Sequence, residues 1–549
     1  MRRLPLPLVP FLAAALLHLG ALRGGFHFDD VHAVAGNPAI GDLRNVPSFF
    51  ADPARFSAAG EGSMYRPLLL MLHAVNAAQA RGTGSAIPWL VTNLLLHAAC
   101  SSGVFLLVRS LLRRRGVERS EVPALAASLL FALHPLAAEV VDYVSARSSS
   151  LSFGCTLAAL LAHLRARERG GAWWAAPMLL GTAAMLSRET AVGLPILVGI
   201  LEGLLPGTNR GRAFRTIPSL LLALGFLALR SAVLGTVLPP STARDVEPEA
   251  GWGRSLSTNV VLQTLACVRF LGLLLWPQGL TVDHTFPRVG GLGDPLFLLS
   301  AAILLVVALL AAALIRRPLC VLGFSLVAWG LAPYFLAPLN VVFAEHRAYP
   351  SLAGACLVLG DGATALLAAW PGRAALLKGA SAVGLLALAG RSAARDADWR
   401  AGLEDLPLWE SALRVSPDSF RAHHGVANAL FEKGDLDGAE RHYREALATY
   451  PRYDAARLSL ASVLVRRTDP AALDEAVALL DELLARRPGH VLARFKLAGA
   501  LEARFLLGGN PADAARCDQI LRALAAENPS DRNARVLHEV FRRERVQKD

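Results

Sequence analysis

Two adjacent carboxylates, Asp29 and Asp30, follow the first apolar run of the chain, within the segment GGFHFDDVHAVAGNP at 24–38. A single loop carboxylate would indicate little. A carboxylate beside several arginines has a chemistry of its own, because the acid can accept a proton while guanidinium groups hold an anion. The interpretation of this acidic pair therefore depends on which other polar residues gather around it.

Polar residues recur at the ends of later apolar runs, in the segments MYRPLLL, HPLAAEVVDYVSARSS, SRET and AEHRAYPS. Ionisable groups cost about 2.5–3.5 kcal/mol each at the centre of a membrane span, and less near its end, so a cluster of them indicates a functional site. Taken singly, they also fit structural roles, such as a snorkelling anchor or an interhelical hydrogen bond. The candidates are Arg66, His134, Glu139, Arg147, Arg188, His346 and Arg347.

The elements that must position these residues are membrane-spanning helices. Hydrophobic residues make up 54% of the 549 residues, and the mean hydropathy is +0.42. Apolar runs long enough to cross a bilayer core of about 30 Å recur throughout residues 1–398. We predict an all-α polytopic bundle of about eleven spans in this region. The expected spans are 4–22, 89–108, 123–141, 148–164, 172–186, 191–206, 216–234, 295–315, 319–338, 350–370 and 374–391.

The arginines predict the orientation of this bundle, because cytoplasmic loops are rich in Lys and Arg. Basic clusters fall at alternate loops if the apolar stretch 258–277 is an interfacial or re-entrant helix. Whether that stretch crosses the membrane stays open. With eleven spans, Asp29 and the C-terminal region lie on the same outer face. The basic clusters include 2–3, 113–115, 165–169 and 210–215.

A carboxylate and several arginines at an outer membrane boundary are the parts needed to transfer a sugar from a lipid phosphate. Phosphate is a good leaving group, so the reaction needs no general acid. It needs a base for the acceptor hydroxyl and cations for the phosphate. Arginine suits the second task because its planar guanidinium grips phosphate through two N–H groups.

Other classes of site fit the sequence less well. The formal charge of +11 is spread over short loops between apolar runs, which is a topology signal, so we expect no nucleic-acid partner. No arrangement of His, Cys and acidic residues has the spacing of a catalytic zinc site. We expect no resident metal, although a divalent cation that bridges Asp29 and the phosphate is left open.

Beyond residue 398 the chain is polar, and 399–549 is predicted to be a tetratricopeptide-repeat α-solenoid. The segment 420–451 has the spacing of this repeat, with alanines at the close helix crossings and a closing Pro451. Two degenerate repeats follow, which gives about the minimum for a stable array. Such an array presents a concave surface, so a polypeptide acceptor or partner protein is expected, with a plain helical spacer as the alternative.

The segment 399–416 reads as an entry helix before the repeats. Its apolar residues recur with helical spacing and could dock the array onto the membrane domain. These residues are Trp399, Leu403, Leu406 and Trp409.

A series of segments occurs in order along the chain: FHFDD, YRPLLLMLHAVN, TNLLLHA, LFALHPLAAEVVDYVSARSSSL, SRET, LTVDHTFP and AEHRAYPSLAG. Each is weak alone, but the series, together with the repeat tail, resembles the transmembrane and tetratricopeptide-repeat mannosyltransferase family. The resemblance implies a GT-C fold related to that of the protein O-mannosyltransferases. It also implies a polyprenyl-phosphate-linked donor, typically of mannose, and an acidic pair in the first external loop.

The resemblance also implies roles for individual residues. Asp29 is expected to be the base or the acceptor-orienting group with Asp30 as its partner, one facing the reaction and the other pairing with Arg66 or His32. Arg188 stands where the family usually has Lys, and many protein O-mannosyltransferases have Asp-Glu in place of Asp-Asp, so the division of labour between the two acids stays open. Arg66, Arg188, Arg347 and His346 are expected to bind the lipid phosphate, and Glu139, Arg147 and His134 to support them.

The leading hypothesis is an integral-membrane glycosyltransferase that moves a sugar, expected to be mannose, from a polyprenyl phosphate to a protein Ser or Thr hydroxyl. An oligosaccharide or O-antigen-type ligase is one alternative, and a non-catalytic membrane-anchored repeat scaffold is another. The heavy use of Ala, Leu, Gly and Arg is typical of a high-GC bacterium. We therefore expect the inner membrane, with the site on the periplasmic side, or the endoplasmic-reticulum membrane if the source is eukaryotic.

Overall fold

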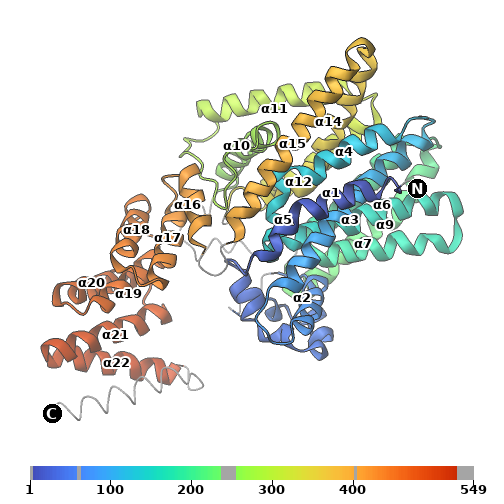
Figure 1. Cartoon of the computed structure of the whole chain (residues 1–549). Helices are drawn as coiled ribbons and strands as arrows, with labels where there is room; N and C mark the ends of the chain where they lie inside the picture. Colours follow the sequence, from blue (N-terminus) through green and yellow to red (C-terminus); the bar gives the residue numbers. More distant parts are fainter. Residues whose placement is uncertain (1–3, 59–63, 237–254, 340, 401–404, 528–549) are drawn as a thin grey trace. The chain divides into compact units, whose positions relative to one another are not determined.

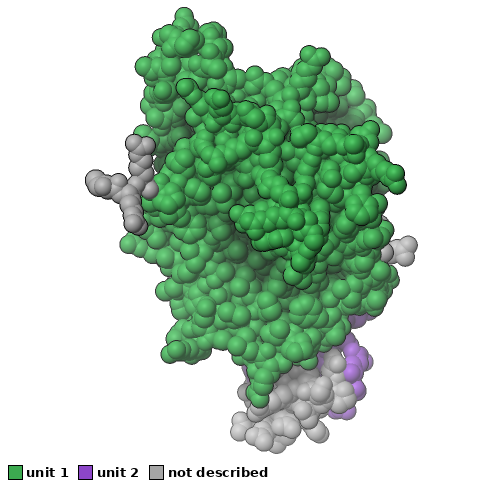
Figure 2. All heavy atoms as spheres, turned by 90° about the vertical axis from the view of Figure 1, so that its right-hand side faces the viewer, with its two compact units in different colours: residues 1–403 green, residues 404–549 purple. Residues whose placement is uncertain are grey.

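The computed structural model describes all residues except 1–3, 59–63, 237–254, 340, 401–404 and 528–549 (Figure 1). Helices dominate the described residues, and no β-strand occurs among them. The chain divides into two compact units, residues 1–403 and residues 404–549 (Figure 2). The all-α fold class predicted from the sequence is confirmed.

The first unit is a bundle of α-helices joined by short 3₁₀ turns. Its later helices return to pack against the first ones, since α14 lies against α4 and α15 contacts the end of α1 (Figure 1). The helices are α1 (Leu8–Leu17), α2 (Pro67–Ala80), α3 (Ile87–Arg114), α4 (Glu121–Leu133), α5 (Ala138–Asp142), α6 (Arg147–Arg169), α7 (Ala175–Ser187), α8 (Leu194–Leu204), α9 (Asn209–Leu234), α10 (Leu256–Leu275), α11 (Pro295–Ala313), α12 (Pro318–Leu331), α13 (Pro333–Leu336), α14 (Tyr349–Ala369) and α15 (Ala374–Asp398).

Seven helices in the described residues are long and apolar enough to cross a membrane, or eight if one bent pair counts as a single span. The bent pair is α4 with the segment Pro135–Asp142, at an angle of 59°. Pro135 accounts for the break, because it has no N–H group and keeps the preceding residue out of the helical conformation. The predicted spans 172–186 and 191–206 are the shorter helices α7 and α8. The predicted count of about eleven is therefore not confirmed.

The stretch 258–277, expected to be an interfacial or re-entrant helix, lies almost entirely within α10. This helix has 20 residues and meets the same criterion of length and composition as the other candidate spans. Arg269 within it donates to the carbonyl oxygen of Gly279 at 2.8 Å. By length and composition α10 is a candidate crossing, so the interfacial interpretation has no support from its size.

Helices α11 and α15 leave most of their apolar surface open. Only 6% of the most apolar stretch of α11 is buried, and none of that of α15. Leu305, Val306 and Leu386 are 60%, 66% and 72% exposed. Long helices with apolar side chains on an open surface are suited to contact with lipid. Together with the candidate spans, they identify a multi-pass membrane protein.

Glycines allow α12 and α14 to pack closely. A Cβ atom on Gly354 would lie 2.3 Å from the carbonyl oxygen of Gly323, and one on Gly330 would lie 2.2 Å from Ser351 Oγ. Small residues of this kind permit backbones of membrane helices to approach each other. The contact sets the position of Tyr334, just after α12, relative to Arg347, just before α14.

The described part of the second unit, residues 405–527, has an entry helix followed by three antiparallel helix pairs, each helix packing on the next. Ala427, Ala439 and Ala446 are completely buried, as expected for small residues at helix crossings. Gly434 turns the chain between the first two paired helices with a φ of +83°. The helices are α16 (Leu406–Val415), α17 (Phe420–Glu432), α18 (Leu436–Thr449), α19 (Asp454–Arg467), α20 (Pro470–Arg486), α21 (Val491–Gly508) and α22 (Pro511–Glu527).

The expected entry helix 399–416 is shorter than predicted. α16 begins at Leu406, and Trp399 belongs to the first unit. Trp409 packs on the first repeat, because a Cβ atom on Gly425 would lie 2.2 Å from its ring. Leu403 lies outside the described residues. Trp399 and Trp409 therefore serve different units.

Candidate active site

Asp30 is a buried acid with a structural set of partners. It accepts hydrogen bonds from the backbone N–H groups of His27 (3.1 Å), Val144 (3.3 Å) and Ser145 (2.7 Å), and from Ser145 Oγ (2.5 Å). Burial raises its pKa to about 6 in spite of these bonds. Asp30 does not pair with Arg66 or His32, the partners expected for one of the two acids. Its hydrogen bonds instead connect the first loop to the turn Val144–Ala146.

Asp29 is the open member of the pair, with a side chain 69% exposed. Its Oδ1 lies 3.5 Å from His32 Nε2, and its backbone N–H donates to the hydroxyl of Tyr143 at 3.3 Å. Burial of part of the group would raise the pKa of Asp29, but its contacts with His32 and Tyr143 hold that pKa below its ordinary value. The carboxylate is therefore ionised at neutral pH and free to accept a proton.

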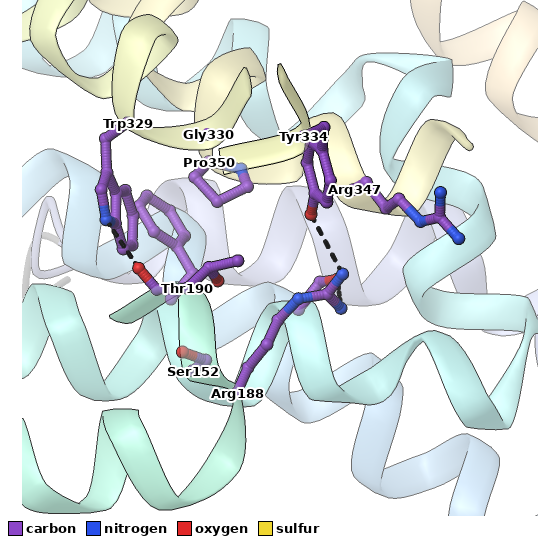
Figure 3. A pocket seen from close by; sticks show the side chains of 10 residues that line it. Ser152, Arg188, Thr190, Trp329, Gly330, Tyr334, Arg347 and Pro350 are labelled. Carbon is purple, nitrogen blue, oxygen red and sulfur yellow. Dashed lines mark hydrogen bonds between the residues drawn. The ribbon is translucent and has the colours of Figure 1, made fainter. Parts of the chain in front are cut away.

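Arg188 and Arg347 line one pocket between α6, α7, α12 and α14 (Figure 3). Arg188 is 7% exposed and donates to Ser148 Oγ (2.8 Å), Ser149 Oγ (2.7 Å) and the Tyr334 hydroxyl (3.2 Å). Arg347 donates to the carbonyl oxygen of Val341 at 2.6 Å, and its guanidinium lies 5.7 Å from the centre of the Tyr334 ring. Within the described residues, neither arginine forms an ion pair with a carboxylate.

The pocket is almost closed. Its free volume is about 10 Å³, which is room for about one water molecule. A phosphate group could enter only if side chains around it moved. The remaining lining residues are Ser152, Phe153, Thr190, Trp329, Gly330 and Pro350, and the Trp329 indole closes one end by donating to the carbonyl oxygen of Thr190 (Figure 3).

Arg66 lies next to this pocket but has a carboxylate partner. Its Nε and Nη2 donate to the two oxygens of Glu189 at 3.0 and 2.8 Å. Burial would raise the pKa of Glu189, but the guanidinium groups of Arg66 and Arg188 lower it strongly. The positive charge of Arg66 is thus largely balanced, unlike those of Arg188 and Arg347.

His346 and Glu139 form a second acid–base pair. Glu139 accepts from the His346 backbone N–H and from Nδ1, both at 2.8 Å. In the neutral ring this places the proton on Nδ1 and leaves Nε2 as an acceptor. The His346 ring packs edge-on against Tyr143 with centroids 6.3 Å apart. A continuous set of contacts therefore runs from Asp29 through Tyr143 and His346 toward the pocket.

Arg147 and His134, the other supporting candidates, lie in structural networks and do not line the pocket. Arg147 is fully buried, and its acceptors among the described residues are all neutral. His134 accepts from the backbone N–H of Leu136 through Nδ1 and contacts the carbonyl oxygen of Leu274 at 3.1 Å through Nε2. The acceptors of Arg147 are Asn93 Oδ1 (2.6 Å), Asn76 Oδ1 (2.7 Å), the Trp89 carbonyl oxygen (2.6 Å) and His73 Nδ1 (3.4 Å).

Sequence reasoning did not select several residues of this region as candidates. Glu189 lies within the SRET segment, next to the candidate Arg188, and this adjacent pair of opposite charges could have identified it. Ser148 and Ser149 open α6, where their hydroxyls face Arg188. Tyr143 and Tyr334 gave no signal, because a tyrosine beside an apolar run is common at a membrane interface.

The chain is similar to known proteins in its repeats and over much of its length. A tetratricopeptide-repeat model matches residues 420–453. Protein O-mannosyl-transferase Tmtc1 of Drosophila melanogaster is 29% identical over 323 residues, which cover 52% of this chain and 35% of the relative. Protein O-mannosyl-transferase TMTC4 is 26% identical in Mus musculus and 27% in Homo sapiens, over 77% and 76% of this chain and 63% of each relative. The chain is a homologue of these transferases.

The resemblance to the transmembrane and tetratricopeptide-repeat family is confirmed by these relatives. The chain spans 35% to 63% of the length of these relatives of the O-mannosyl-transferase family. Within the described residues, no group of three or more His, Cys, Asp or Glu side chains is arranged to hold a metal ion.

Proposed function

We propose that the chain transfers mannose from a polyprenyl phosphate to a Ser or Thr hydroxyl of a protein on the extracytoplasmic face of a membrane. The observation that carries the proposal is that two arginines, Arg188 and Arg347, line one pocket without carboxylate partners among the described residues. The names of the homologous transferases support the reaction class.

The two arginines are suited to hold the phosphate of the donor. A buried cation with neutral partners is costly, and a phosphate would supply the missing negative charge. Arg188 donates hydrogen bonds to serine and tyrosine hydroxyls. Phosphate oxygens can replace these hydroxyls as acceptors. As charge develops on the departing phosphate, both guanidinium groups stabilise it more strongly, which is the requirement for catalysis.

Asp29 is suited to be the base. The acceptor hydroxyl oxygen attacks the anomeric carbon of the sugar and forms the new glycosidic bond. The bond from that carbon to the phosphate oxygen breaks, and the electron pair leaves with the lipid phosphate. The hydroxyl proton passes to the Asp29 carboxylate, which the low pKa keeps available at neutral pH.

The repeat unit is suited to present the acceptor. Its three helix pairs form the kind of array that offers a concave surface to an extended polypeptide. The alternation of basic loops requires α10 to lie at the interface; the number of spans is then odd, and this unit lies on the same side as Asp29. In a bacterium that side is the periplasm, and in a eukaryote it is the lumen of the endoplasmic reticulum.

The proposal is tested with purified protein, radiolabelled polyprenyl-phosphate mannose and a Ser/Thr-rich peptide. We expect transfer by the wild type, at least a hundredfold lower kcat for Asp29→Asn, and a higher KM for the lipid donor in Arg188→Ala and Arg347→Ala. Arg317→Ala is the matched control, because Arg317 is exposed and pairs with Asp361 at 2.8 Å away from the pocket. Its kinetics should match the wild type.

Two results would contradict the proposal. One is the absence of transfer from any polyprenyl-linked sugar by well-folded protein, which would favour a repeat scaffold. The other is an unchanged rate in Asp29→Asn, which would leave the reaction without its base.

A further inference from the structure

An aromatic cluster of Phe28, Tyr143 and Trp399 encloses the start of the acidic loop. The rings of Tyr143 and Trp399 stack with centroids 5.7 Å apart and 19° between their planes. The Phe28 ring packs edge-on against both, at 5.7 and 6.1 Å. Tyr143 is 6% exposed and Trp399 is 1% exposed, so neither ring can turn without opening the core.

The backbone at Phe28 is strained. Its φ is +46°, a left-handed conformation that costs a residue with a side chain about 1 kcal/mol or more. Such a conformation persists only where the surrounding structure imposes it. Ring contacts hold Phe28 on one side, and the buried hydrogen bonds hold Asp30 on the other. Because Phe28 and Asp30 are both held in place, the Asp29 side chain between them points to solvent.

The Tyr143 hydroxyl is the polar group of the cluster that reaches Asp29. It accepts from the Asp29 backbone N–H at 3.3 Å, which leaves its own O–H to donate to a nearby acceptor. The nearness of this hydroxyl also helps to hold the pKa of the Asp29 carboxyl below its ordinary value. The other titratable groups that act on Asp29 are His32, at 3.5 Å, and His346, besides the neighbouring Asp30.

We propose that Tyr143 is a positioning residue, whose hydroxyl accepts from the Asp29 backbone N–H and so holds Asp29 with its carboxylate in the orientation that accepts the proton of the acceptor hydroxyl. The stack on Trp399 fixes the ring that carries this hydroxyl. The inference rests on the proposed function, since it assigns Tyr143 a task in the same reaction. Tyr143 forms no bond to either substrate and acts only through Asp29.

The kinetic test is a double-mutant cycle between Tyr143→Phe and Asp29→Asn. The change Tyr143→Phe removes the hydroxyl but keeps the stacked ring. One lost neutral hydrogen bond corresponds to a change of up to about tenfold, so we expect kcat of Tyr143→Phe to fall by up to about tenfold with an unchanged KM for the lipid donor. In the Asp29→Asn background the second change should lower the residual rate less than twofold. The acid limb of the pH–rate profile should move to higher pH.

A second readout does not depend on activity. Carbodiimide with glycine ethyl ester modifies exposed carboxyls, and mass spectrometry follows the modification of Asp29 against pH. We expect Tyr143→Phe to speed this modification and to shift its pH midpoint upward. Tyr65→Phe is the control, because the Tyr65 hydroxyl also makes a partly buried hydrogen bond, to the carbonyl oxygen of Phe50 at 3.0 Å. This variant should leave the modification of Asp29 unchanged.

The outcomes separate the two proposals. An unchanged modification of Asp29 in Tyr143→Phe, or an equal loss of rate with and without the Asp29 carboxylate, would overturn the positioning role. A wild type that modifies normally but never transfers mannose would contradict the proposed function, while the modification still decides whether Tyr143 positions Asp29.

Discussion

Neighbouring residues of the same type have different tasks in this chain. Asp29 and Asp30 are adjacent in the sequence, yet the Asp29 side chain is 69% exposed and Asp30 is fully buried. Four hydrogen bonds consume the acceptor capacity of Asp30. The arginines divide in the same way, because Arg66 has a carboxylate partner while Arg188 and Arg347 have only neutral ones in the described part of the chain.

The two aspartates should therefore respond differently to the same substitution. Asp30→Asn replaces a carboxylate oxygen by an NH₂ group that faces backbone donors, so we expect a loss of about 2 kcal/mol in the free energy of unfolding at pH 7. Asp29→Asn should leave stability within about 0.5 kcal/mol, since its side chain is exposed. Thermal unfolding of the two variants in detergent checks this difference. Equal melting temperatures would contradict it.

The pH dependence of stability has a defined sign at Asp30. Its pKa is raised from an ordinary 3.8 to about 6 in the folded chain, so folding favours the protonated form. The contribution is complete below pH 4 and is lost as pH rises to 6, by up to about 3 kcal/mol. The stability gap between the wild type and Asp30→Asn should accordingly narrow over this range in melts at pH 4, 5, 6 and 7. A gap that widens would refute the assignment.

Arg66 and Glu189 should behave as a coupled pair. The Arg66 side chain is 10% exposed and that of Glu189 is 37% exposed, so solvent screens the pair only in part. A double-mutant cycle with Arg66→Met and Glu189→Gln is expected to give a coupling of about 1 kcal/mol in unfolding free energy. The exposed pair Arg44–Asp42 serves as the control, and its coupling should be too small to measure because solvent screens it.

At the scale of helices, close contacts and breaks place the site residues. Pro135 breaks α4 from α5 and so turns Glu139 toward His346. The glycines of α12 and α14 bring the end of one helix beside the start of the other, where Tyr334 and Arg347 meet. These elements are stiff, because the backbones are in direct contact and no side chain can adjust between them.

The α12–α14 contact predicts a sharp intolerance to one methyl group. Gly354→Ala places a Cβ atom 2.3 Å from the Gly323 carbonyl oxygen, so the helices must separate, at a cost of about 1–3 kcal/mol. We expect a lower melting temperature and a higher KM for the lipid donor, because Arg347 moves with α14. Gly379→Ala in α15 is the control, since its Cβ would meet nothing within 4 Å. A Gly354→Ala variant as stable as this control would refute the packing argument.

For the whole molecule, the open question is which side of the membrane each unit faces. The basic clusters at alternate loops predict that the first loop and the repeat unit lie on one side, opposite Arg113. The native cysteines are buried or half-buried, so their reaction with a membrane-impermeant maleimide should be slow. Single substitutions can therefore report the topology.

We expect Asp52→Cys and Glu482→Cys to label from the extracytoplasmic side of intact cells, and Arg113→Cys to label only after the membrane is opened. Labelling of Glu482→Cys from the cytoplasmic side would show that the number of crossings is even. That outcome would separate the repeats from Asp29 and remove their proposed task of presenting the acceptor.

The sequence by itself determined the elements and the candidate residues of this protein. Long apolar runs predict spans and a repeat spacing predicts helix pairs, because both signals depend on local periodicity. Only the tertiary structure decided the partners. It placed Asp30 against Ser145, Arg66 against Glu189 and Tyr143 against Asp29, since contacts between residues far apart in the chain leave no trace in local spacing. The number of membrane crossings could not be predicted from the sequence alone, because helix breaks and short helices such as α7 and α8 depend on how neighbouring helices pack.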